Sequence, residues 1–419
     1  MKLALLGSLV GSLLLAGTQD SELNVNRRYV VDSVVVVGKG WRADVAEPTD
    51  KLSPGLRRDM FALVGQKLNP SVLDNLAGRL KKELSAREVA HHILRADVPD
   101  HVRIEFEVKP AGFSVTANLT KGMYSSKQGW SGGGMVGFTY RQNTFLGGLI
   151  SDGDTLIERF AGINARYENK RLLGNDRLAL RFDYGTYHEQ WNNNTISALE
   201  NAQEVTGPAY RTRESFAPVL SIAVAKPLTL EIGAAFERFG SQLPNTPDQS
   251  ANALIAGLRY HERISETEFL QDISADYSLR AATRAFGSDF VFASHLAGLH
   301  YRIGHGRHKV SDAVTLGAIT GRAPLSERLV AGNSYYLRGW NKFDIDPIGG
   351  NRLVHNTVDY RYGPFQAFYD AGAIWDGGQP VSIRHSLGIG VRESVFTLAV
   401  AFPMRTGHVE PVFIMGMIY

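Results

Sequence analysis

The chain has 419 residues, of which 44% are hydrophobic and 21% charged, so it has the composition of a folded protein and the length for about two or three domains. A net charge of +3 is too small to favour a nucleic acid partner, and the lack of cysteine excludes disulfide bonds and thiolate chemistry. Mean hydropathy is −0.14, and beyond the N-terminus no apolar run approaches the roughly 18 residues of a spanning helix, which excludes a helical membrane protein.

The first residues, 1–17, have the pattern of a signal peptide. Lys2 supplies the positive charge, Leu3–Leu15 the apolar segment, and Ala16 and Gly17 the small residues near a cleavage point. A membrane anchor is the alternative interpretation. Because no cysteine follows the apolar segment, a bacterial lipid anchor is excluded.

Residues 28–110 predict a small α+β domain. The order is strand, helix, helix, strand, strand, and each helix begins with a capping residue followed by a proline. The predicted elements are a strand at Val30–Val37, helices that start after Ser53 and Asn69, and strands at Arg87–Val98 and Val102–Val108. Adjacent residues of a strand face opposite sides, so His91 and His92 are poorly placed to share a metal and are expected to be surface residues.

Residues 113–419 alternate between apolar and polar with a period of two. One such run has Leu228, Leu230, Ile232, Ala234 and Phe236 on one face. A soluble β-sandwich would alternate in the same way, but its strands are usually about five or six residues long. Here the strands run to about ten or more and are separated by Gly, Asn and Asp turns, which predicts a transmembrane antiparallel β-barrel. The segment Asn192–Glu214 is expected to be an extracellular loop.

Counting strands tests this prediction. Five strands are predicted after Arg338 and ten before it, whereas a chain that enters from the periplasm needs an odd number to place the Arg338 loop outside. Either one strand is missed, and Gly147–Phe160 is a segment with room for an extra hairpin, or Phe113–Lys121 is not a strand. The total is therefore sixteen strands or fourteen. The last strand carries Phe413 and ends on Tyr419, a terminal aromatic that is similar to the recognition signal of outer-membrane barrels.

A loop from Asn333 to Trp340 carries Arg338 beside Gly339, and the strand that holds Phe368–Gly372 follows about thirty residues later. Alternation places Tyr369 and Ala371 on the lipid side of that strand, so Asp370 and Gly372 face the lumen. Asp359 faces the lumen from the preceding strand. A guanidinium binds a carboxylate bidentately, so these residues predict a loop that folds inward and is held by a charge pair. The alternative is that the lumen charges are simply solvated.

Five motifs in order resemble those of the BamA/TamA superfamily of outer-membrane assembly and translocation barrels. They are Leu337-Arg338-Gly339-Trp340, Phe368-Tyr369-Asp370-Ala371-Gly372, Val358-Asp359-Tyr360-Arg361 after Gly349-Gly350, Ser386-Leu387-Gly388-Ile389-Gly390, and Asn143-Thr144-Phe145-Leu146-Gly147. Each motif alone is weak, but five in the family's order are strong, and together with the N-terminal domain, which resembles a POTRA module, the similarity covers essentially the whole mature chain.

The resemblance implies a bacterial outer-membrane protein with sixteen barrel strands and its POTRA domain in the periplasm. It implies that Asp370 is the partner of Arg338, with Asp359 close by and Gly372 leaving room for the guanidinium. The implied partners are outer-membrane lipid, unfolded client polypeptides that add a strand to the POTRA sheet, and periplasmic chaperones or accessory lipoproteins. Neither a cofactor nor a metal is implied. The chain departs from the family in having one POTRA module where the principal assembly factors have several.

Two other functions compete with assembly or translocation. A passive porin-like channel would need neither an inward loop nor a POTRA domain. An outer-membrane hydrolase would need a catalytic motif, and the sequence has no His-Glu-x-x-His. His188-Glu189 is the nearest candidate and lies at a predicted strand end. The sequence therefore predicts a protein that is not an enzyme.

Overall fold

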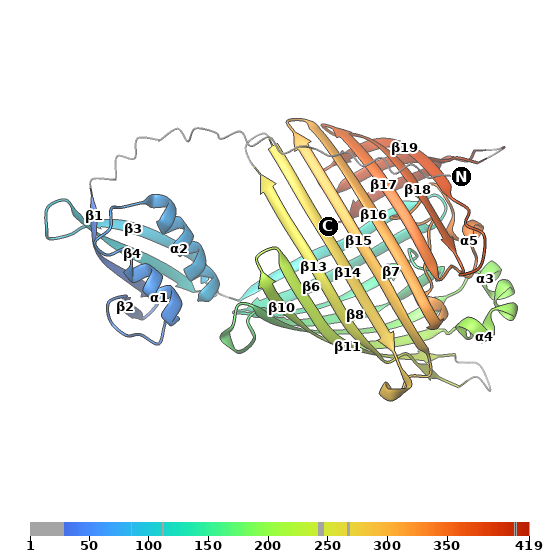
Figure 1. Cartoon of the computed structure of the whole chain (residues 1–419), viewed down its shortest axis with the longest axis horizontal. Coiled ribbons are helices and arrows are strands. Elements are labelled where there is room, and N and C mark those ends of the chain that lie inside the picture. Colours follow the sequence, from blue (N-terminus) through green and yellow to red (C-terminus); the bar gives the residue numbers. More distant parts are fainter. Residues whose placement is uncertain are drawn as a thin grey trace. The chain divides into compact units, whose positions relative to one another are not determined.

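The structure is a computed structural model that describes residues 29–84, 86–110, 113–241, 247–265, 269–405, 407 and 409–418. The chain divides into two compact units, with the boundary between Ala111 and Gly112 (Figure 1). The predicted signal peptide and Tyr419 lie outside the described residues. In the described part of the chain, each helix is too short or too polar to span a bilayer.

The N-terminal unit is a four-stranded sheet with two helices. Its elements are β1 (Val30–Gly38), β2 (Trp41–Asp44), α1 (Pro54–Phe61), α2 (Pro70–Glu83), β3 (Ala86–Arg95) and β4 (His101–Pro110). The sheet order is β2-β1-β4-β3, and β1 runs parallel to β4. Both helices start as predicted, because the side chain of Ser53 accepts a hydrogen bond from Leu56 N and that of Asn69 from Ser71 N.

The core of this unit lies between the helices and one face of the sheet, where Val34, Met60, Leu80, Ile104 and Phe106 are fully buried. The predicted order omits one element of this unit, β2, which forms a hairpin with β1. A strand of four residues is too short to show alternation in the sequence. His91 and His92 face opposite ways, toward Asp74 and Glu107 respectively.

The second unit is a closed antiparallel barrel (Figure 1). The strands before the long connection are β5 (Ser114–Ser125), β6 (Gly129–Tyr140), β7 (Asn143–Asp152), β8 (Arg159–Asn169), β9 (Leu178–Gln190), β10 (Thr212–Ala225), β11 (Leu228–Gly240), β12 (Gln249–Ser250), β13 (Ala253–Ser265), β14 (Phe269–Ala282), β15 (Val291–His305) and β16 (His308–Arg322). Those after it are β17 (Arg352–Tyr362), β18 (Phe365–Trp375), β19 (Arg384–Glu393), β20 (Phe396–Pro403) and β21 (Val412–Ile418).

The described strands make a sixteen-stranded barrel when β12 and β13, which both pair with β11, are counted as one. The prediction of sixteen strands is confirmed and the fourteen-strand alternative is wrong. Residues 114–121 belong to β5, which pairs with β6. The segment Gly147–Phe160 holds the end of β7, a turn and the start of β8, so no extra hairpin lies there.

The outward faces of the strands carry large apolar side chains. A row of rings crosses β5 to β11 with centroids 4.8 to 6.5 Å apart, made by Phe113, Phe138, Phe145, Tyr167, Phe182, Phe216 and Phe236. Most of these rings are exposed outside the barrel. An apolar outer belt on strands of this length fits a barrel whose outer surface contacts lipid.

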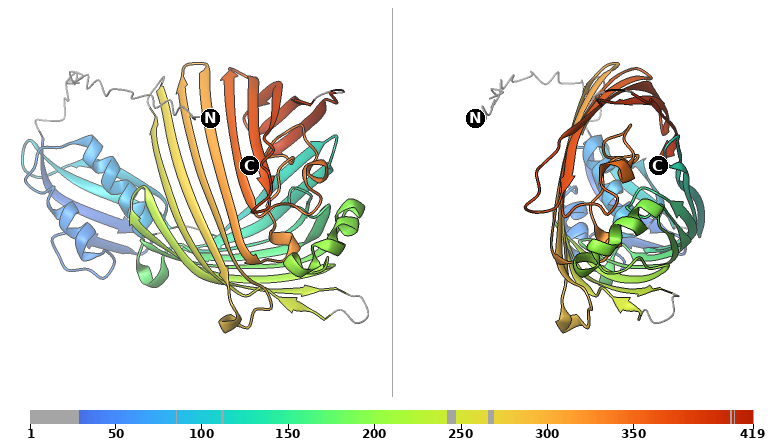
Figure 2. Two further views of the ribbon diagram at one scale, coloured as in Figure 1. Left: turned by 45° about the vertical axis from the view of Figure 1, so that its right-hand side comes forward. Right: turned by 90° about the vertical axis from the view of Figure 1, so that its right-hand side faces the viewer.

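Several connections at one end of the barrel fold into it. The segment between β9 and β10, where an extracellular loop was expected, contains α3 (Asn193–Ala198) and α4 (Gln203–Thr206). The segment between β16 and β17 contains α5 (Lys342–Ile345). Apolar residues from three connections pack in one buried cluster, formed by Leu156, Leu199, Ala202, Leu325 and Val330. Figure 2 shows the β16–β17 segment inside the ring of strands and the β9–β10 helices at the same end of the barrel.

Candidate functional site: the inward loop between β16 and β17

The connection of residues 323–351, called here the inward loop, carries the Arg338 motif into the barrel. Leu337 is fully buried and packs in a cluster with Ala331 of the same loop, Leu353 of β17 and Ile374 of β18. This apolar contact fixes the tip of the loop against the inner wall. Arg338 is thereby placed over the strands β17 and β18.

Arg338 makes a bidentate pair with Asp370 of β18. Its Nε donates to Asp370 Oδ2 at 2.9 Å and its Nη2 donates to Oδ1 at 2.7 Å. The backbone N–H of Arg338 donates to the same Oδ2 at 2.9 Å. The carboxylate of Asp370 is fully buried, so it receives its hydrogen bonds from the protein rather than from water.

Other side chains of the wall complete the contacts of the guanidinium. The Thr357 hydroxyl accepts from Arg338 Nη2 at 2.8 Å and donates to Asp370 Oδ1 at 2.6 Å. Asp359 Oδ2 lies 3.5 Å from Nη2, and the guanidinium carbon lies 3.6 Å from the centroid of the Phe368 ring. Burial opposes the charge of Arg338, but the bonds to Asp370 and the charge of Asp359 outweigh it and raise the pKa of the guanidinium. Arg338 is therefore a charged group held within the barrel.

The residues on either side of Arg338 have a strained backbone conformation. Leu337 has φ +53° and Gly339 has φ +99°, both in the left-handed region. A Cβ on Gly339 would lie 3.1 Å from the Cβ of Ala401, so the glycine is required both for its φ and for its close approach to β20. Left-handed backbone at a residue such as Leu337 costs about 1–2 kcal/mol. The bonds of the Leu337 and Arg338 N–H groups to the wall offset that cost.

His355 of β17 supports the loop in a way that the sequence did not indicate. Its Nε2 accepts a hydrogen bond from Leu337 N at 3.2 Å, which requires a neutral ring with the proton on Nδ1. Its ring also contacts the Tyr336 ring edge-on. A Cβ on Gly372 would lie 2.8 Å from Val354 O and 3.3 Å from His355. The glycine therefore makes room for the neighbouring strand and His355, and not for the guanidinium as expected.

Trp340 ties the far side of the tip to β19. Its Nε1 donates to the carbonyl of His385 at 2.9 Å. The guanidiniums of Arg405 and Arg384 lie 4.6 and 5.4 Å from its ring. Cations this close to an indole ring are attracted to its π-face. Trp340 therefore holds the loop to a third strand of the wall.

Lys342 is a second buried cation in the loop, and no sequence pattern indicated it. Its side chain is almost completely buried, and Nζ donates to the carbonyls of Gly153, Thr155 and Ile157 in the β7–β8 turn. Burial lowers the pKa of the Lys342 amine to about 8, and the carboxylates of Asp154 and Asp152 offset only part of that effect. The partners are backbone atoms of a remote segment, which side-chain patterns do not reveal.

Arg328 holds the base of the inward loop. Its Nη2 lies 2.8 Å from both carboxylate oxygens of Asp376 and donates to Gly349 O at 2.6 Å, and its Nε donates to Ile348 O at 2.9 Å. Arg328 precedes the tip and Ile348 and Gly349 follow it, so this side chain closes the two ends of the loop on each other. The loop is thus held at its base, at Lys342 and at its tip.

A cavity of about 260 Å³ lies beside the Arg338 contacts, within the lumen. It is lined by Arg338 and Asp359 on one side, and by Met123 of β5 and Ile414 of β21 on the other. Since β5 and β21 are the first and last strands and pair with each other, the tip of the loop faces the seam that closes the barrel.

Residues 273–395 match the family model described as Omp85 superfamily domain, a range that holds Arg338, Thr357, Asp359 and Asp370. The match confirms the predicted resemblance to the superfamily that includes BamA and TamA, while the single POTRA module stays a prediction. The comparison with curated protein sequences gave no match.

Solved Omp85-type barrels have the same fold. BamA from Haemophilus ducreyi, in a crystal structure lacking POTRA domains 1–3, aligns with a TM-score of 0.62 at 15% identity, covering 93% of this chain and 85% of that one. CdiB from Acinetobacter baumannii aligns with a TM-score of 0.54 at 14% identity, covering 94% and 74%. CdiB from Escherichia coli aligns with a TM-score of 0.51 at 11% identity, covering 93% of this chain and 76% of that one. At such identities the likeness shows the fold alone.

The other sequence candidates lie away from this site. His188 and Glu189 are in β9, and the Glu189 carboxylate pairs with Arg213 at 3.0 Å, so it is neutralised by a neighbouring strand. Phe413 is an exposed residue of β21. Among the described residues no group of three or more acidic, His or Cys side chains is arranged to hold a metal.

Proposed function

We propose that this protein is an Omp85-type outer-membrane barrel that inserts or translocates client polypeptides, with the inward loop as its internal control element. The observation that carries the proposal is the buried bidentate pair between Arg338 and Asp370 inside an Omp85-type barrel. A passive pore gains nothing from a loop that is held inside its lumen at three places. A barrel that admits polypeptide needs an obstruction that is ordered at rest and able to move.

The seam between β5 and β21 is where a client strand would enter. Ile414–Ile418 of β21 pair with Lys121–Ser125 of β5, whereas β5 begins at Ser114. Within the described residues, the stretch Ser114–Thr120 has no partner on the β21 side. An unpaired strand edge is a template for a further strand.

The N-terminal unit would receive the client before the barrel does. In its sheet order β2-β1-β4-β3, the ten residues of β3 form an edge that is open to pairing within the described unit. Strand addition at such an edge uses main-chain hydrogen bonds and so accepts clients of many sequences. In this proposal the unit is a periplasmic POTRA domain.

The proposal is tested by client insertion with the purified protein in liposomes. A denatured outer-membrane barrel is added, and its folded, protease-resistant fraction is measured for wild type and Arg338→Ala. Arg238→Ala is the matched control, because Arg238 is exposed and pairs with Asp248 outside the inward loop. We expect insertion by wild type and by the control, and weaker insertion by Arg338→Ala. Equal insertion by all three would contradict the role of the loop, and no insertion by any would contradict the function.

A further inference from the structure

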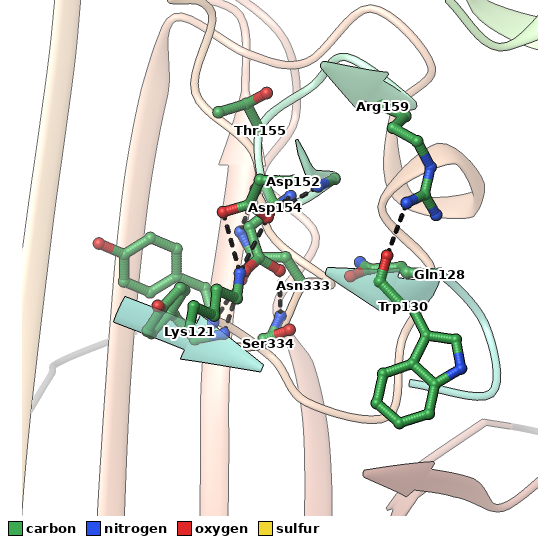
Figure 3. A network of polar contacts seen from close by, with 12 residues as sticks. Lys121, Gln128, Trp130, Asp152, Asp154, Thr155, Arg159, Asn333 and Ser334 are labelled. Atoms are coloured by element: carbon green, nitrogen blue, oxygen red, sulfur yellow. Dashed lines mark hydrogen bonds and ion pairs between the residues drawn. The ribbon is translucent and has the colours of Figure 1, made fainter. Parts of the chain in front are cut away.

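A second polar cluster connects the seam strand β5 to the inward loop (Figure 3). Lys121 of β5 is buried, and its Nζ donates to both oxygens of Asp152, at 2.8 and 3.0 Å, and to the carboxylate of Asp154. Asp152 ends β7, and Asp154 follows it in the β7–β8 turn. One ammonium group thus pairs with two carboxylates within the barrel.

Lys121 faces inward because β5 has a bulge. The register with β6 shifts between Leu119 and Lys121, so Thr120 is an extra residue. Before the bulge Val115 and Leu119 are exposed on the outer face, and after it Lys121 is buried. A bulge needs space on the neighbouring strand, and a Cβ on Gly133 would lie 2.8 Å from the Thr120 hydroxyl. The local sequence therefore rotates this part of β5 to bring the lysine into the lumen.

The same turn also holds the inward loop. Asp154 Oδ1 accepts from Ser334 N at 3.0 Å, and the Asp154 carbonyl accepts from Asn333 Nδ2 at 2.7 Å. The ring of Tyr335 lies 5.3 Å from Lys121 Nζ. Three residues lie between Ser334 and Arg338, so the cluster contacts the loop immediately before its tip. Figure 3 shows Asp154 between Lys121 on one side and Asn333 and Ser334 on the other.

Lys121 also belongs to the seam itself, since it is paired with Ile418 of β21. If β5 moves away from the turn, Asp152 and Asp154 lose their counter-ion while still buried, which is strongly unfavourable. If instead the loop leaves, Asp154 loses its bonds to Asn333 and Ser334, and water reaches the ion pair and weakens it. Each movement therefore lowers the cost of the other.

We infer that Lys121, Asp152 and Asp154 couple the seam to the inward loop, so that release of the Arg338 tip loosens the pairing of β5 with β21. The biological use of this coupling rests on the proposed function, but the coupling itself is a property of the protein without a client. Lys121 acts here as a positioning residue, because it contacts the turn and not a client.

The coupling is tested by hydrogen exchange of the backbone amides of residues 121–125 in the purified full chain without client. Four proteins are compared: wild type, Arg338→Ala, a charge-neutral variant that combines Lys121→Met, Asp152→Asn and Asp154→Asn, and that variant with Arg338→Ala added. We expect Arg338→Ala to speed exchange at the seam by about five-fold or more in the wild-type background. In the charge-neutral background, Arg338→Ala should leave seam exchange unchanged.

An equal effect of Arg338→Ala in both backgrounds, or no effect in either, would overturn the inference. If the charge-neutral variant does not fold, Lys121→Arg with and without Arg338→Ala replaces it, and the conservative change should keep the five-fold response.

A second readout uses the absence of cysteine from the chain. Tyr124 and Met415 face each other across the seam, so Tyr124→Cys with Met415→Cys reports closure by disulfide formation. Adding Arg338→Ala should slow formation, and an unchanged rate would count against the coupling. If Arg338→Ala speeds seam exchange but the protein inserts no client, only the proposed function is rejected. If the protein inserts clients but Arg338→Ala leaves seam exchange unchanged, only this inference is rejected.

Discussion

Replacing Arg338 by alanine tests the structural basis of the site most simply. The substitution removes the two guanidinium bonds to Asp370 and leaves only the Arg338 backbone N–H and the Thr357 hydroxyl on a fully buried carboxylate. Removing one partner of a buried ion pair costs about 3–5 kcal/mol, since the other charge stays buried without compensation. At about 1.4 kcal/mol per factor of ten, the ratio of docked to released loop should fall by roughly 100- to 1,000-fold or more.

Trypsin cleavage after Lys342 measures this release, because Lys342 is only 1% exposed while the loop is docked. We expect rapid cleavage there in Arg338→Ala and slow cleavage in wild type and in Arg238→Ala. The double variant Arg338→Ala with Asp370→Asn should recover part of the protection, since a neutral amide is less costly to bury than a carboxylate. Cleavage of Arg338→Ala at the wild-type rate would refute the reasoning that the pair holds the loop.

Three further predictions follow from the geometry. Gly339→Ala should make docking of the inward loop less favourable by more than about 1 kcal/mol. The φ of +99° at this position is strained for alanine, and the new Cβ would lie 3.1 Å from Ala401 Cβ. Trypsin cleavage after Lys342 measures the effect, and cleavage as slow as in wild type would contradict it. Burial in the docked loop lowers the pKa of the Lys342 amine from its usual 10.5 to about 8. Below pH 8 the amine is charged in both the docked and the released loop, so the full free-energy cost of burying the charge opposes docking. As the pH rises from 8 to 10.5 the docked amine loses its proton and this cost disappears. Intrinsic amide exchange accelerates with pH, so exchange of residues 332–341 should accelerate less between pH 7.5 and 10 than the intrinsic rates do, and this deficit should vanish in Lys342→Met. Deleting residues 28–110 should abolish client insertion yet leave the barrel able to enter membranes, and undiminished insertion would favour a role for the barrel alone.

Alternation along the strands was enough to predict much of the barrel and part of the site. Asp370 and Asp359 are placed toward the lumen by a period of two, and an arginine beside a glycine in a connecting loop is a recognisable partner for an inward carboxylate. The five strands predicted after the loop are the five strands β17 to β21 of the structure, and their number could be predicted because turns with Gly, Pro and Asp separate them.

The remaining contacts depend on geometry that single-sequence patterns do not contain. Lys342 binds backbone carbonyls of a segment more than 180 residues away, and any residue type at those positions offers the same carbonyls. Lys121 faces inward only because one bulge shifts the alternation of β5, and a bulge leaves no regular signature. The role of Gly372 was misassigned because the position of His355 beside it depends on how β17 and β18 pack.

In the proposed function, a loop held by Arg338 obstructs a barrel that handles polypeptides. Single-channel conductance of the full-length protein in planar bilayers, compared between wild type and Arg338→Ala, measures this obstruction. We expect a small, fluctuating conductance in wild type that becomes larger and longer-lived when Arg338 is removed. A large, steady conductance that does not change with the substitution would contradict it and would mean that the barrel is an open pore.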